Sequence, residues 1–310
     1  MIRKILIAAL AVTGLMFGSA VQTKAETIVV VTTQNQVFTF DSATPGTTTM
    51  PTNVTGLATG ESLVGIDRRP VNGLIYGVSS ANRIYTINAA TGAATFVSTL
   101  STPLVGTSFG VDFNPVVDRL RITSNARQNL RVNVDTGAAI VDGLLTPAVI
   151  VSPLDPNIGA SAYSNNFAGA SSTTLYDIDF FRDRLVIQNP PNDGTLVRVG
   201  ELAPLVPPMG ADITTDLVAF DISGLSGVAY ASLTPPGFTF SVLYSINLGT
   251  GLATAIGTIG SGNIGQINGL AAPVGNPIPE PATLLLLGTG LAGVAAKARR
   301  RRQARENEAA

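Results

Sequence analysis

The chain of 310 residues contains no cysteine, no histidine and no tryptophan. Without cysteine there are no disulfides, so a secreted fold of this size must depend on its packed core. The absence of histidine and cysteine excludes a Ser-His-Asp triad, a thiol nucleophile and a zinc site of imidazole or thiolate ligands. Paired carboxylates, tyrosine, arginine, or a calcium ion held by Asp and Asn remain available. The composition therefore favours a non-catalytic protein without excluding an enzyme.

Basic residues are scarce in the middle of the chain. Residues 26–276 hold ten arginines, no lysine and seventeen acidic residues, which gives this region a net charge of −7. Affinity for phosphates needs a basic face, so we expect no nucleic-acid partner. Most of the other basic residues lie near the two ends of the chain.

The N-terminal end is typical of a secretory signal peptide. Arg3 and Lys4 precede an apolar run from Ile5 to Phe17, and small residues follow. We predict a signal helix within residues 1–25, with cleavage after Ala20 or, as the favoured site, after Ala25. Export is the consequence.

The C-terminal end contains a second targeting segment. An apolar run from Ala282 to Ala296 follows a proline-rich stretch and precedes Lys297 and an arginine cluster. Fifteen helical residues rise about 22 Å, short of a hydrocarbon core of about 30 Å, and the basic side chains can snorkel to the cytoplasmic headgroups. We predict a linker at 274–281, a transmembrane helix at 282–298 and a basic cytoplasmic tail at 299–310. A permanent, unprocessed anchor is the alternative.

This tail resembles the PEP-CTERM sorting signal of Gram-negative bacteria. The residues that carry the resemblance are Pro279, Glu280, Pro281, the run Ala-Thr-Leu-Leu-Leu-Leu-Gly-Thr-Gly-Leu-Ala-Gly and the cluster Arg299, Arg300, Arg301 and Arg302. The resemblance implies an exosortase as partner, a transient hold in the inner membrane and removal of the helix. Delivery to the outer surface or the extracellular matrix would follow.

One hairpin pattern occurs five times in the region between the two ends. In each copy an alternating β-type run ends at an Asx residue, and a glycine follows a few residues later. The Asx residues are Asp41, Asn88, Asn133, Asn189 and Asn247. The Asx side chain can bond the backbone of a turn, and glycine supplies the positive φ that closes it. The turn explains the pattern without any function.

Two further strand-like runs precede most of these hairpins and one follows each, so a unit has four strands. We predict an all-β fold: a five-bladed β-propeller over residues 26–273, closed by the C-terminal strand. The first unit lacks an opening strand, and Gly265–Leu270 has no unit of its own, so the second would complete the first. A β-solenoid or, as the main rival, a pair of β-sandwich sheets would also show short strands and glycine-rich turns.

The region also resembles the bacterial family known as domain of unknown function 4394. The resemblance rests on Leu63–Gly92, on Phe109–Pro115 with Asp118–Arg121, and on Leu175–Leu196, and it extends over nearly the whole region between the targeting segments. It implies the fold and the exported location. The family supplies no activity and no catalytic residues.

Candidate ligand residues occur at equivalent places in the predicted opening strands. They are Asp67, Asp112 and Asp221, with Asn268 in the closing strand and Tyr163 or Ser164 in the divergent fourth unit. Opening strands line the channel of a propeller, so these oxygens are candidates for binding Ca²⁺, which takes six to eight oxygen ligands. The competing interpretation is that each aspartate caps a turn, because Pro70, Pro115 or Gly224 follows three residues later.

Two more groups of charged residues are candidates either for a binding site or for local ion pairs. Asp177 and Asp179 lie on the same face of a predicted strand. They could form a carboxylate pair for acid–base chemistry or metal binding, or they could form ion pairs with Arg182 and Arg184. The pairs Arg68-Arg69 and Arg119/Arg121 either contact acidic polysaccharide or pair with carboxylates at the surface. Local ion pairing is the default for both groups.

The leading functional hypothesis is an exported surface or matrix protein, a non-catalytic binding or scaffold module whose loops contact polysaccharide or other proteins. The alternative is a calcium-dependent propeller hydrolase acting on carbohydrate or lactone substrates.

Overall fold

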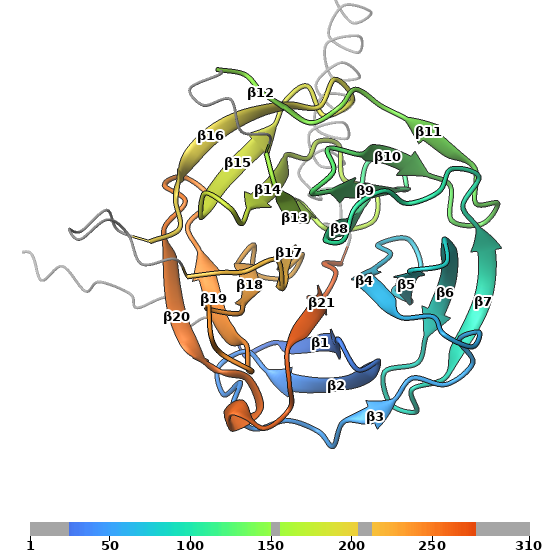
Figure 1. Cartoon of the computed structure of the whole chain (residues 1–310), viewed down its shortest axis with the longest axis vertical. Helices are drawn as coiled ribbons and strands as arrows, with labels where there is room; N and C mark the ends of the chain where they lie inside the picture. The colour runs from blue at the N-terminus through green and yellow to red at the C-terminus, as the bar shows by residue number, and fades with distance from the viewer. Residues whose placement is uncertain (1–24, 150–155, 204–212, 277–310) are drawn as a thin grey trace, which may run out of the picture.

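The computed structural model describes residues 25–149, 156–203 and 213–276. Regular structure in these ranges is β-strand, apart from one short 3-10 turn at Ile259–Gly262. Five sheets stand around a central axis (Figure 1), which confirms the predicted all-β five-bladed propeller. Within the same ranges, no helix has the length and hydropathy of a membrane span. The predicted signal helix and transmembrane helix lie outside the described residues.

Each blade is a four-stranded antiparallel meander whose strands follow one another from the channel to the rim. Blade 1 contains β21 (Ile267–Ala271), β1 (Thr27–Thr32), β2 (Gln36–Asp41) and β3 (Thr52–Asn53); blade 2 contains β4 (Leu63–Arg68), β5 (Ile75–Ser79), β6 (Arg83–Ile87) and β7 (Ala94–Thr99); blade 3 contains β8 (Phe109–Asn114), β9 (Arg119–Ser124), β10 (Asn129–Val132) and β11 (Ala139–Val141). Blade 4 contains β13 (Ile158–Tyr163), β14 (Leu175–Asp179), β15 (Arg184–Gln188) and β16 (Thr195–Glu201), with β12 (Thr146–Pro147) parallel to β16 at its rim; blade 5 contains β17 (Val218–Ile222), β18 (Ala229–Leu233), β19 (Val242–Ile246) and β20 (Ala253–Thr258).

The C-terminal strand closes the ring, as predicted. Strand β21 pairs antiparallel with β1, with Val29 opposite Ala271 and Val30 opposite Leu270. The inner strands contact one another in the order β21, β4, β8, β13, β17 and back to β21. Blade 1 is therefore built from both ends of the domain, and β1 is not left as an unpaired edge strand.

Apolar clusters between blades form most of the core. Side chains alternate between the two faces of a strand, so each blade offers one apolar face to each neighbour. The clusters join blades 2 and 3, blades 4 and 5, blades 5 and 1, and blades 1 and 2. The fifth cluster consists of Leu145, Ile158, Val186 and Leu196, none of which lies on a blade 3 strand. Among the described residues, no apolar cluster bridges blades 3 and 4.

Polar side chains fill this seam between blades 3 and 4 instead. Arg121 of β9 is only 1% exposed, and its guanidinium makes four hydrogen bonds. Its acceptors are Tyr163 Oη at 3.2 Å, Asn129 Oδ1 at 2.6 Å, Asp142 Oδ2 at 2.6 Å and Asn192 Oδ1 at 2.9 Å. A buried charge is tolerated only when it is paired and hydrogen-bonded, and this network satisfies both conditions.

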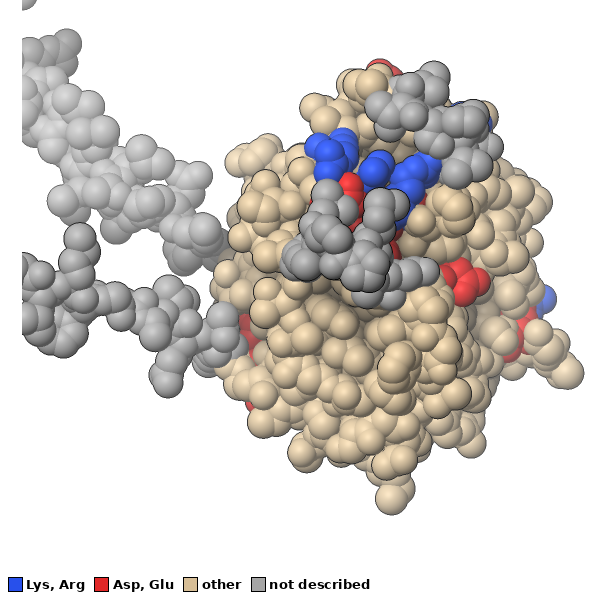
Figure 2. Space-filling model, turned by 60° about the vertical axis from the view of Figure 1, so that its left-hand side comes forward, with Lys and Arg blue, Asp and Glu red and all other residues tan. Residues whose placement is uncertain are grey.

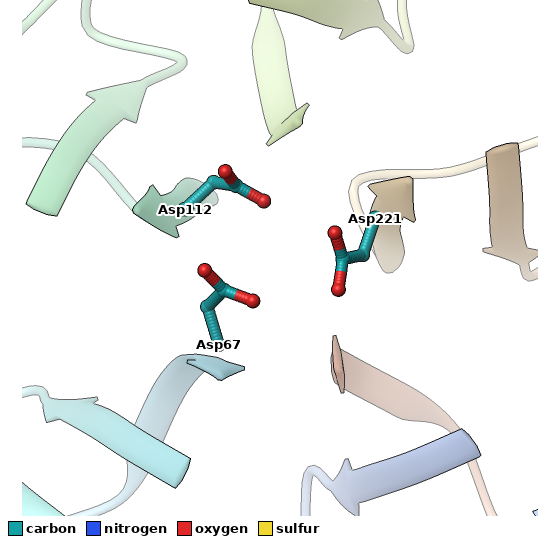
Figure 3. Close-up of side chains that lie close together, drawn as sticks. All are labelled: Asp67, Asp112 and Asp221. Atoms are coloured by element: carbon teal, nitrogen blue, oxygen red, sulfur yellow. The ribbon is translucent and has the colours of Figure 1, made fainter. Parts of the chain in front are cut away.

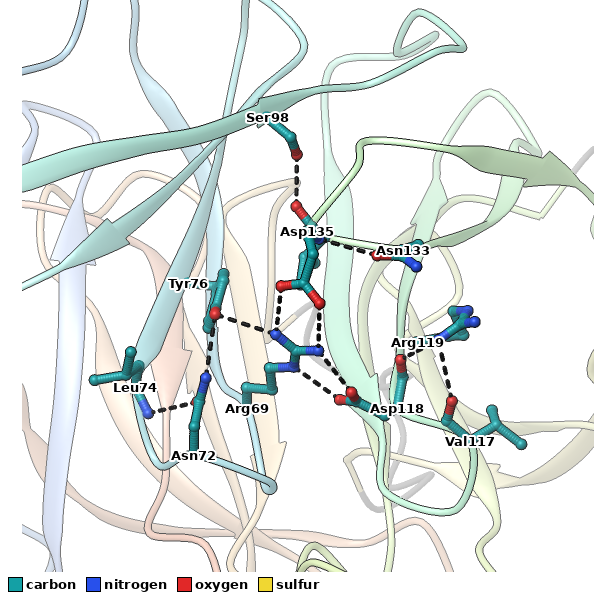
Figure 4. Close-up of polar contacts among 11 residues, drawn as sticks. Arg69, Asn72, Leu74, Tyr76, Ser98, Val117, Asp118, Arg119, Asn133 and Asp135 are labelled. Atoms are coloured by element: carbon teal, nitrogen blue, oxygen red, sulfur yellow. Dashed lines mark hydrogen bonds and ion pairs between the residues drawn. The ribbon is translucent and has the colours of Figure 1, made fainter.

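Arg69 makes a similar connection between blades 2 and 3 (Figure 4). It donates to Asp118 at 2.6 and 2.8 Å and to Asp135 at 2.8 and 3.0 Å, and its guanidinium lies 5.6 Å from the centroid of the Tyr76 ring. The sequence predicted carboxylate partners for the arginine pairs but placed them at the surface. Arg69 and Arg121 are both buried, so neither is available to a polysaccharide.

The repeated hairpin forms the expected Asx turn in four copies, where the side-chain oxygens of Asp41, Asn88, Asn133 and Asn247 accept from the amide two residues later. In the fourth unit the turn at Asn189 differs and contains a cis peptide bond to Pro190. In blade 2, Asn88 Oδ1 accepts hydrogen bonds from the amides of Ala90 and Thr91, and Gly92 has a φ of 73°. The glycine has a second role that the sequence did not reveal. A Cβ on Gly92 would collide with the carbonyl oxygen of Asn53 in blade 1. Likewise, a Cβ on Gly137 in blade 3 would collide with the carbonyl oxygen of Thr99 in blade 2. The motif therefore packs each blade against its predecessor.

Candidate functional site

Three buried aspartates meet at one end of the channel. Asp67, Asp112 and Asp221 lie on the inner strands β4, β8 and β17, and all three are fully buried. Figure 3 shows their carboxylates converging from three sides of the axis. One oxygen from each lies within 4.8 Å of the other two. The sequence placed these residues at equivalent positions, and the fold brings them together.

Each aspartate also bonds the backbone of the next blade. The three bonds are Phe113 N to Asp67 Oδ2 at 2.7 Å, Tyr163 N to Asp112 Oδ1 at 3.1 Å and Ala272 N to Asp221 Oδ2 at 2.7 Å. The aspartates therefore bridge blades 2 to 3, 3 to 4 and 5 to 1, rather than capping turns as the competing interpretation held. The second oxygen of Asp112 has no hydrogen-bond partner, whereas the second oxygens of Asp67 and Asp221 each accept from the amide of the following residue.

Alanines occupy the same level in the other two blades. Phe113, Tyr163 and Ala272 each donate their amide to an aspartate of the preceding blade. The residues just before these three, Asp112, Ala162 and Ala271, therefore occupy equivalent positions. The blades that follow an alanine compensate locally: the amides of Arg68 and Ile222 each donate to the aspartate just before them at 2.6 Å. The ring therefore carries three carboxylates and two methyl groups at this level.

Asn268 does not belong to this level of the channel. Its Nδ2 donates to the carbonyl oxygen of Leu63 at 2.8 Å. Leu63 begins β4, four residues before Asp67, which is roughly 13 Å along a strand. In β21 the register equivalent of the aspartates is Ala271, three residues after Asn268. Tyr163, the fourth-unit candidate, contributes its backbone amide to Asp112, and its hydroxyl accepts from Arg121.

A residue that the sequence did not single out lies beside the aspartates. Asn166 is fully buried in the loop after β13, and its Nδ2 is 3.4 Å from Asp221 Oδ1 and 3.4 Å from the carbonyl oxygen of Ile222. Its backbone oxygen accepts from the amide of Gly275 at 2.8 Å. The blade 4 loop thus crosses to blade 5 and to the segment that leaves β21.

Two buried oxygens at this end of the channel have no hydrogen-bond partner: Asp112 Oδ2 and Asn166 Oδ1. A buried polar atom without a partner is costly, so each such atom needs an explanation. None of the ion pairs in the described ranges involves Asp67, Asp112 or Asp221.

The electrostatics of the aspartate cluster oppose full ionisation. Burial raises the pKa of Asp67 and Asp112 well above 3.8, and the neighbouring carboxylates raise them further. Burial also raises the pKa of Asp221 to about 7, against the lowering effect of the amides that bond it. Near neutral pH the site therefore favours a counter-charge, which a proton or a cation can supply.

The cavity between the inner strands is small. The cavity along the channel is lined by inner-strand residues such as Gly65, Val111 and Phe220, and its volume is about 10 Å³. A cavity of that size holds about one water molecule. It has no room for a sugar ring.

A larger groove, of about 340 Å³, lies on blade 4 and includes Arg182, Arg184 and Arg198 in its lining. Figure 2 shows basic side chains clustered in the upper part of the face in view, with acidic side chains among them. Arg182 pairs with Asp179 at 2.8 Å, while Arg184 and Arg198 share Glu201 at 2.9 and 2.8 Å. The expected pairing of Asp179 with Arg182 is present, whereas Arg184 pairs with Glu201.

Asp177 has a different environment from Asp179. It is fully buried in the polar seam, where its Oδ1 accepts from Ser161 Oγ at 2.6 Å and its Oδ2 has no partner. Burial raises its pKa to about 7, although the Ser161 hydrogen bond and the charge of Arg121 act in the opposite direction. This aspartate therefore does not form the metal-binding or acid–base pair with Asp179 that the strand pattern left open.

The raised pKa of Asp177 predicts a pH-dependent stability. Between about pH 4 and pH 7 the folded chain keeps a proton that the unfolded chain releases, so this contribution to stability is lost as the pH rises through 7. A rise from 3.8 to about 7 corresponds to at most about 4 kcal/mol. We expect Asp177→Asn to gain melting temperature over the parent at pH 8 relative to pH 5, by at least about 3 °C in calorimetry.

Asp135→Asn is the matched control for this measurement. Arg69 lowers the pKa of Asp135 below 3.8, so its protonation changes only in more acidic solution. The difference between this variant and the parent should be the same at pH 5 and pH 8. An equally flat difference for Asp177→Asn would show that this carboxylate ionises without cost in the fold.

Comparisons with known proteins identify two regions of the chain. A family model described as a domain of unknown function, DUF4394, matches residues 36–271, and a model of the PEP-CTERM protein-sorting motif matches residues 277–302. No curated protein matches.

Solved structures resemble the chain at low identity. A structural-genomics protein of unknown function from Bacteroides thetaiotaomicron is 14% identical over 74% of this chain and 57% of its own, with a TM-score of 0.46. A chain of a nidogen/laminin complex is 15% identical over 80% and 86%, with a TM-score of 0.45. The glutaminyl cyclase of Myxococcus xanthus is 11% identical over 66% and 88%, with a TM-score of 0.41. The chain spans little more than half the length of the first of these, and none of them indicates an activity for it.

Proposed function

The chain belongs to the DUF4394 family and ends in a PEP-CTERM sorting motif, and from this premise we propose that it is a non-catalytic binding or scaffold module of the outer surface or extracellular matrix. The motif implies export and processing by an exosortase, with the C-terminal segment held in the inner membrane until it is cleaved. In this proposal the propeller is the delivered part, and the sorting segment is discarded.

The observation that carries the proposal is the position of the motif. It begins at residue 277, six residues after β21 ends at Ala271. The ring is thus complete before the sorting segment starts, so cleavage near residue 280 would remove no strand of the fold. A closed ring with exposed loops suits a binding or scaffold role, because loops on a rigid frame can vary without loss of the core.

The hydrolase alternative has weaker support. A catalytic metal keeps an open coordination position for substrate or water. Here the three aspartates are fully buried, and the cavity of about 10 Å³ between the inner strands cannot hold a sugar or lactone ring. The wider grooves lie elsewhere, on blade 4 and on blade 2.

Processing by an exosortase is directly testable. We expect the mature protein to end near residue 280 when it is isolated from cells that contain the enzyme and its C-terminal peptide is identified by mass spectrometry. The double variant Pro279→Ala/Pro281→Ala should remain full-length in the inner membrane, because the extended stretch that the protease recognises is lost.

Pro277→Ala is the control, because it changes a nearby proline outside the Pro-Glu-Pro triplet. It should be processed and exported as the parent is. Full-length parent protein in the inner membrane would instead show a permanent anchor, and a soluble periplasmic protein with an intact C-terminus would contradict sorting altogether.

A further inference from the structure

We propose that Asp67, Asp112 and Asp221 bind one Ca²⁺ ion in the channel, with the side-chain oxygen of Asn166 as a further ligand. The ion would be structural, holding the inner strands of different blades together. The proposal goes beyond the sorted scaffold suggested above and does not depend on where the protein is delivered.

The spacing of the carboxylates fits a cation of this size. If three oxygens lie within 4.8 Å of one another, a central ion is at most about 2.8 Å from each. Ca²⁺ is bound by oxygens at about 2.3–2.6 Å, so a small contraction completes the site, whereas Mg²⁺ requires about 2.0–2.1 Å in a strict octahedron. In Figure 3 the three carboxylates face a common centre from three different strands.

The unpartnered oxygens supply an independent observation. Asn166 is fully buried with its amide against Asp221, yet both contacts of its Nδ2 are at 3.4 Å and its Oδ1 has no partner. Rotation of the Asn166 amide group by about 180° exchanges the places of Oδ1 and Nδ2 with little change in shape. With a cation between Asn166 and the aspartates, the reversed amide would direct Oδ1 to the ion. The same ion would give Asp112 Oδ2 its missing partner.

The donor set also explains why the carboxylates are held so firmly. Each aspartate is fixed by a backbone amide of the next blade, so its second oxygen cannot swing away from the axis. The ion would thus join blades 2, 3 and 5, and Asn166 would add blade 4. The backbone of Gly275, bonded to Asn166, would bring in the segment that follows the closing strand. One cation at this place stabilises closure of the ring.

The experiment uses the processed protein obtained by expressing the full chain. The protein is stripped with EDTA and then melted with EDTA, with 1 mM Mg²⁺ or with 1 mM Ca²⁺, and bound calcium is counted by elemental mass spectrometry after dialysis. We expect about one calcium per chain and a melting temperature about 5–10 °C higher in Ca²⁺ than in EDTA. Mg²⁺ should produce a much smaller shift.

Asp112→Asn is the decisive variant. Its Oδ1 can still accept from the Tyr163 amide, while one negative charge is removed from the cluster. We expect the Ca²⁺ shift to fall below about 1–2 °C and the melting temperature in EDTA to equal or exceed that of the parent, because repulsion between buried carboxylates decreases. A merely structural role for Asp112 predicts the opposite: a lower melting temperature in EDTA with the Ca²⁺ shift preserved.

Asn166→Ala and Asn268→Ala separate the two asparagines. The first should weaken Ca²⁺ binding at least tenfold in titration calorimetry, and the second should leave it unchanged, because Asn268 bonds Leu63 at another level. If the parent binds no calcium and shows no shift, the cluster holds protons alone and the proposal is wrong. Loss of binding in Asn268→Ala with retention in Asn166→Ala would overturn the assigned ligand set.

Discussion

Replacing Arg121 by methionine should lower the melting temperature by about 6–12 °C, which corresponds to about 3 kcal/mol in a domain of this size. Methionine fills much of the same volume but supplies no donor to the four oxygens that Arg121 now bonds. Because the seam between blades 3 and 4 lacks a bridging apolar cluster among the described residues, little else there compensates. Differential scanning calorimetry at pH 7 is the measurement.

Arg131→Met is the matched control. Arg131 also pairs with Asp142, at 2.7 Å, but its side chain is 31% exposed and water can replace it. This change should cost about 1 kcal/mol or less. Equal losses for the two arginine variants would mean that the buried network does not hold the seam.

The architecture was predictable because its signals are local. Each hairpin can be recognised from an alternating run, an Asx residue and a glycine within about ten residues. Five such units at similar spacing indicate a ring. Closure by β21 followed from counting strands, since Ile28–Val31 needed an inner neighbour and Ile267–Leu270 was the strand left over.

The channel site was predictable only in part. The three aspartates occupy equivalent positions in the predicted opening strands. In the structure they make equivalent hydrogen bonds to the backbone of the next blade. Asn268 was matched to them by its place within a short run, but a shift of three residues along β21 moves a side chain to another level of the channel. Asn166 could be found only from the fold, because its loop reaches the aspartates by crossing a blade boundary. Its one signal was the longer loop in the fourth unit.

The polar seam could not be predicted at all. Arg121 follows the alternation of β9 as an ordinary polar residue, and the sequence does not show that its partners Asn129, Asp142 and Asn192 lie on one side of it. The contacts of Arg121 with Tyr163 and Asn192, 42 and 71 positions away, depend on the angle between two blades. The arginine therefore looked like a surface residue, although it is among the most buried side chains in the described part of the molecule.

A close approach between blades 2 and 3 leads to the second large effect. Gly137 has a φ of 75°, and a Cβ placed on it would collide with the carbonyl oxygen of Thr99 at the end of β7. Its own carbonyl accepts from the amide of Ser101 at 2.9 Å, so the two backbones are tied together there. We expect Gly137→Ala to cost more than about 3 kcal/mol, a fall of at least about 6 °C in melting temperature.

Gly73→Ala isolates the conformational part of this cost. Gly73 has a similar φ of 69°, but a Cβ there meets nothing within 4 Å. Alanine at this position should lose only the strain of a left-handed backbone, about 1–2 kcal/mol. The excess loss in Gly137→Ala measures the contact between blades 2 and 3, because the turn conformation is nearly the same in both variants. Equal losses would mean that the turn alone selects glycine in this motif, and that the rim of the ring has room to adjust.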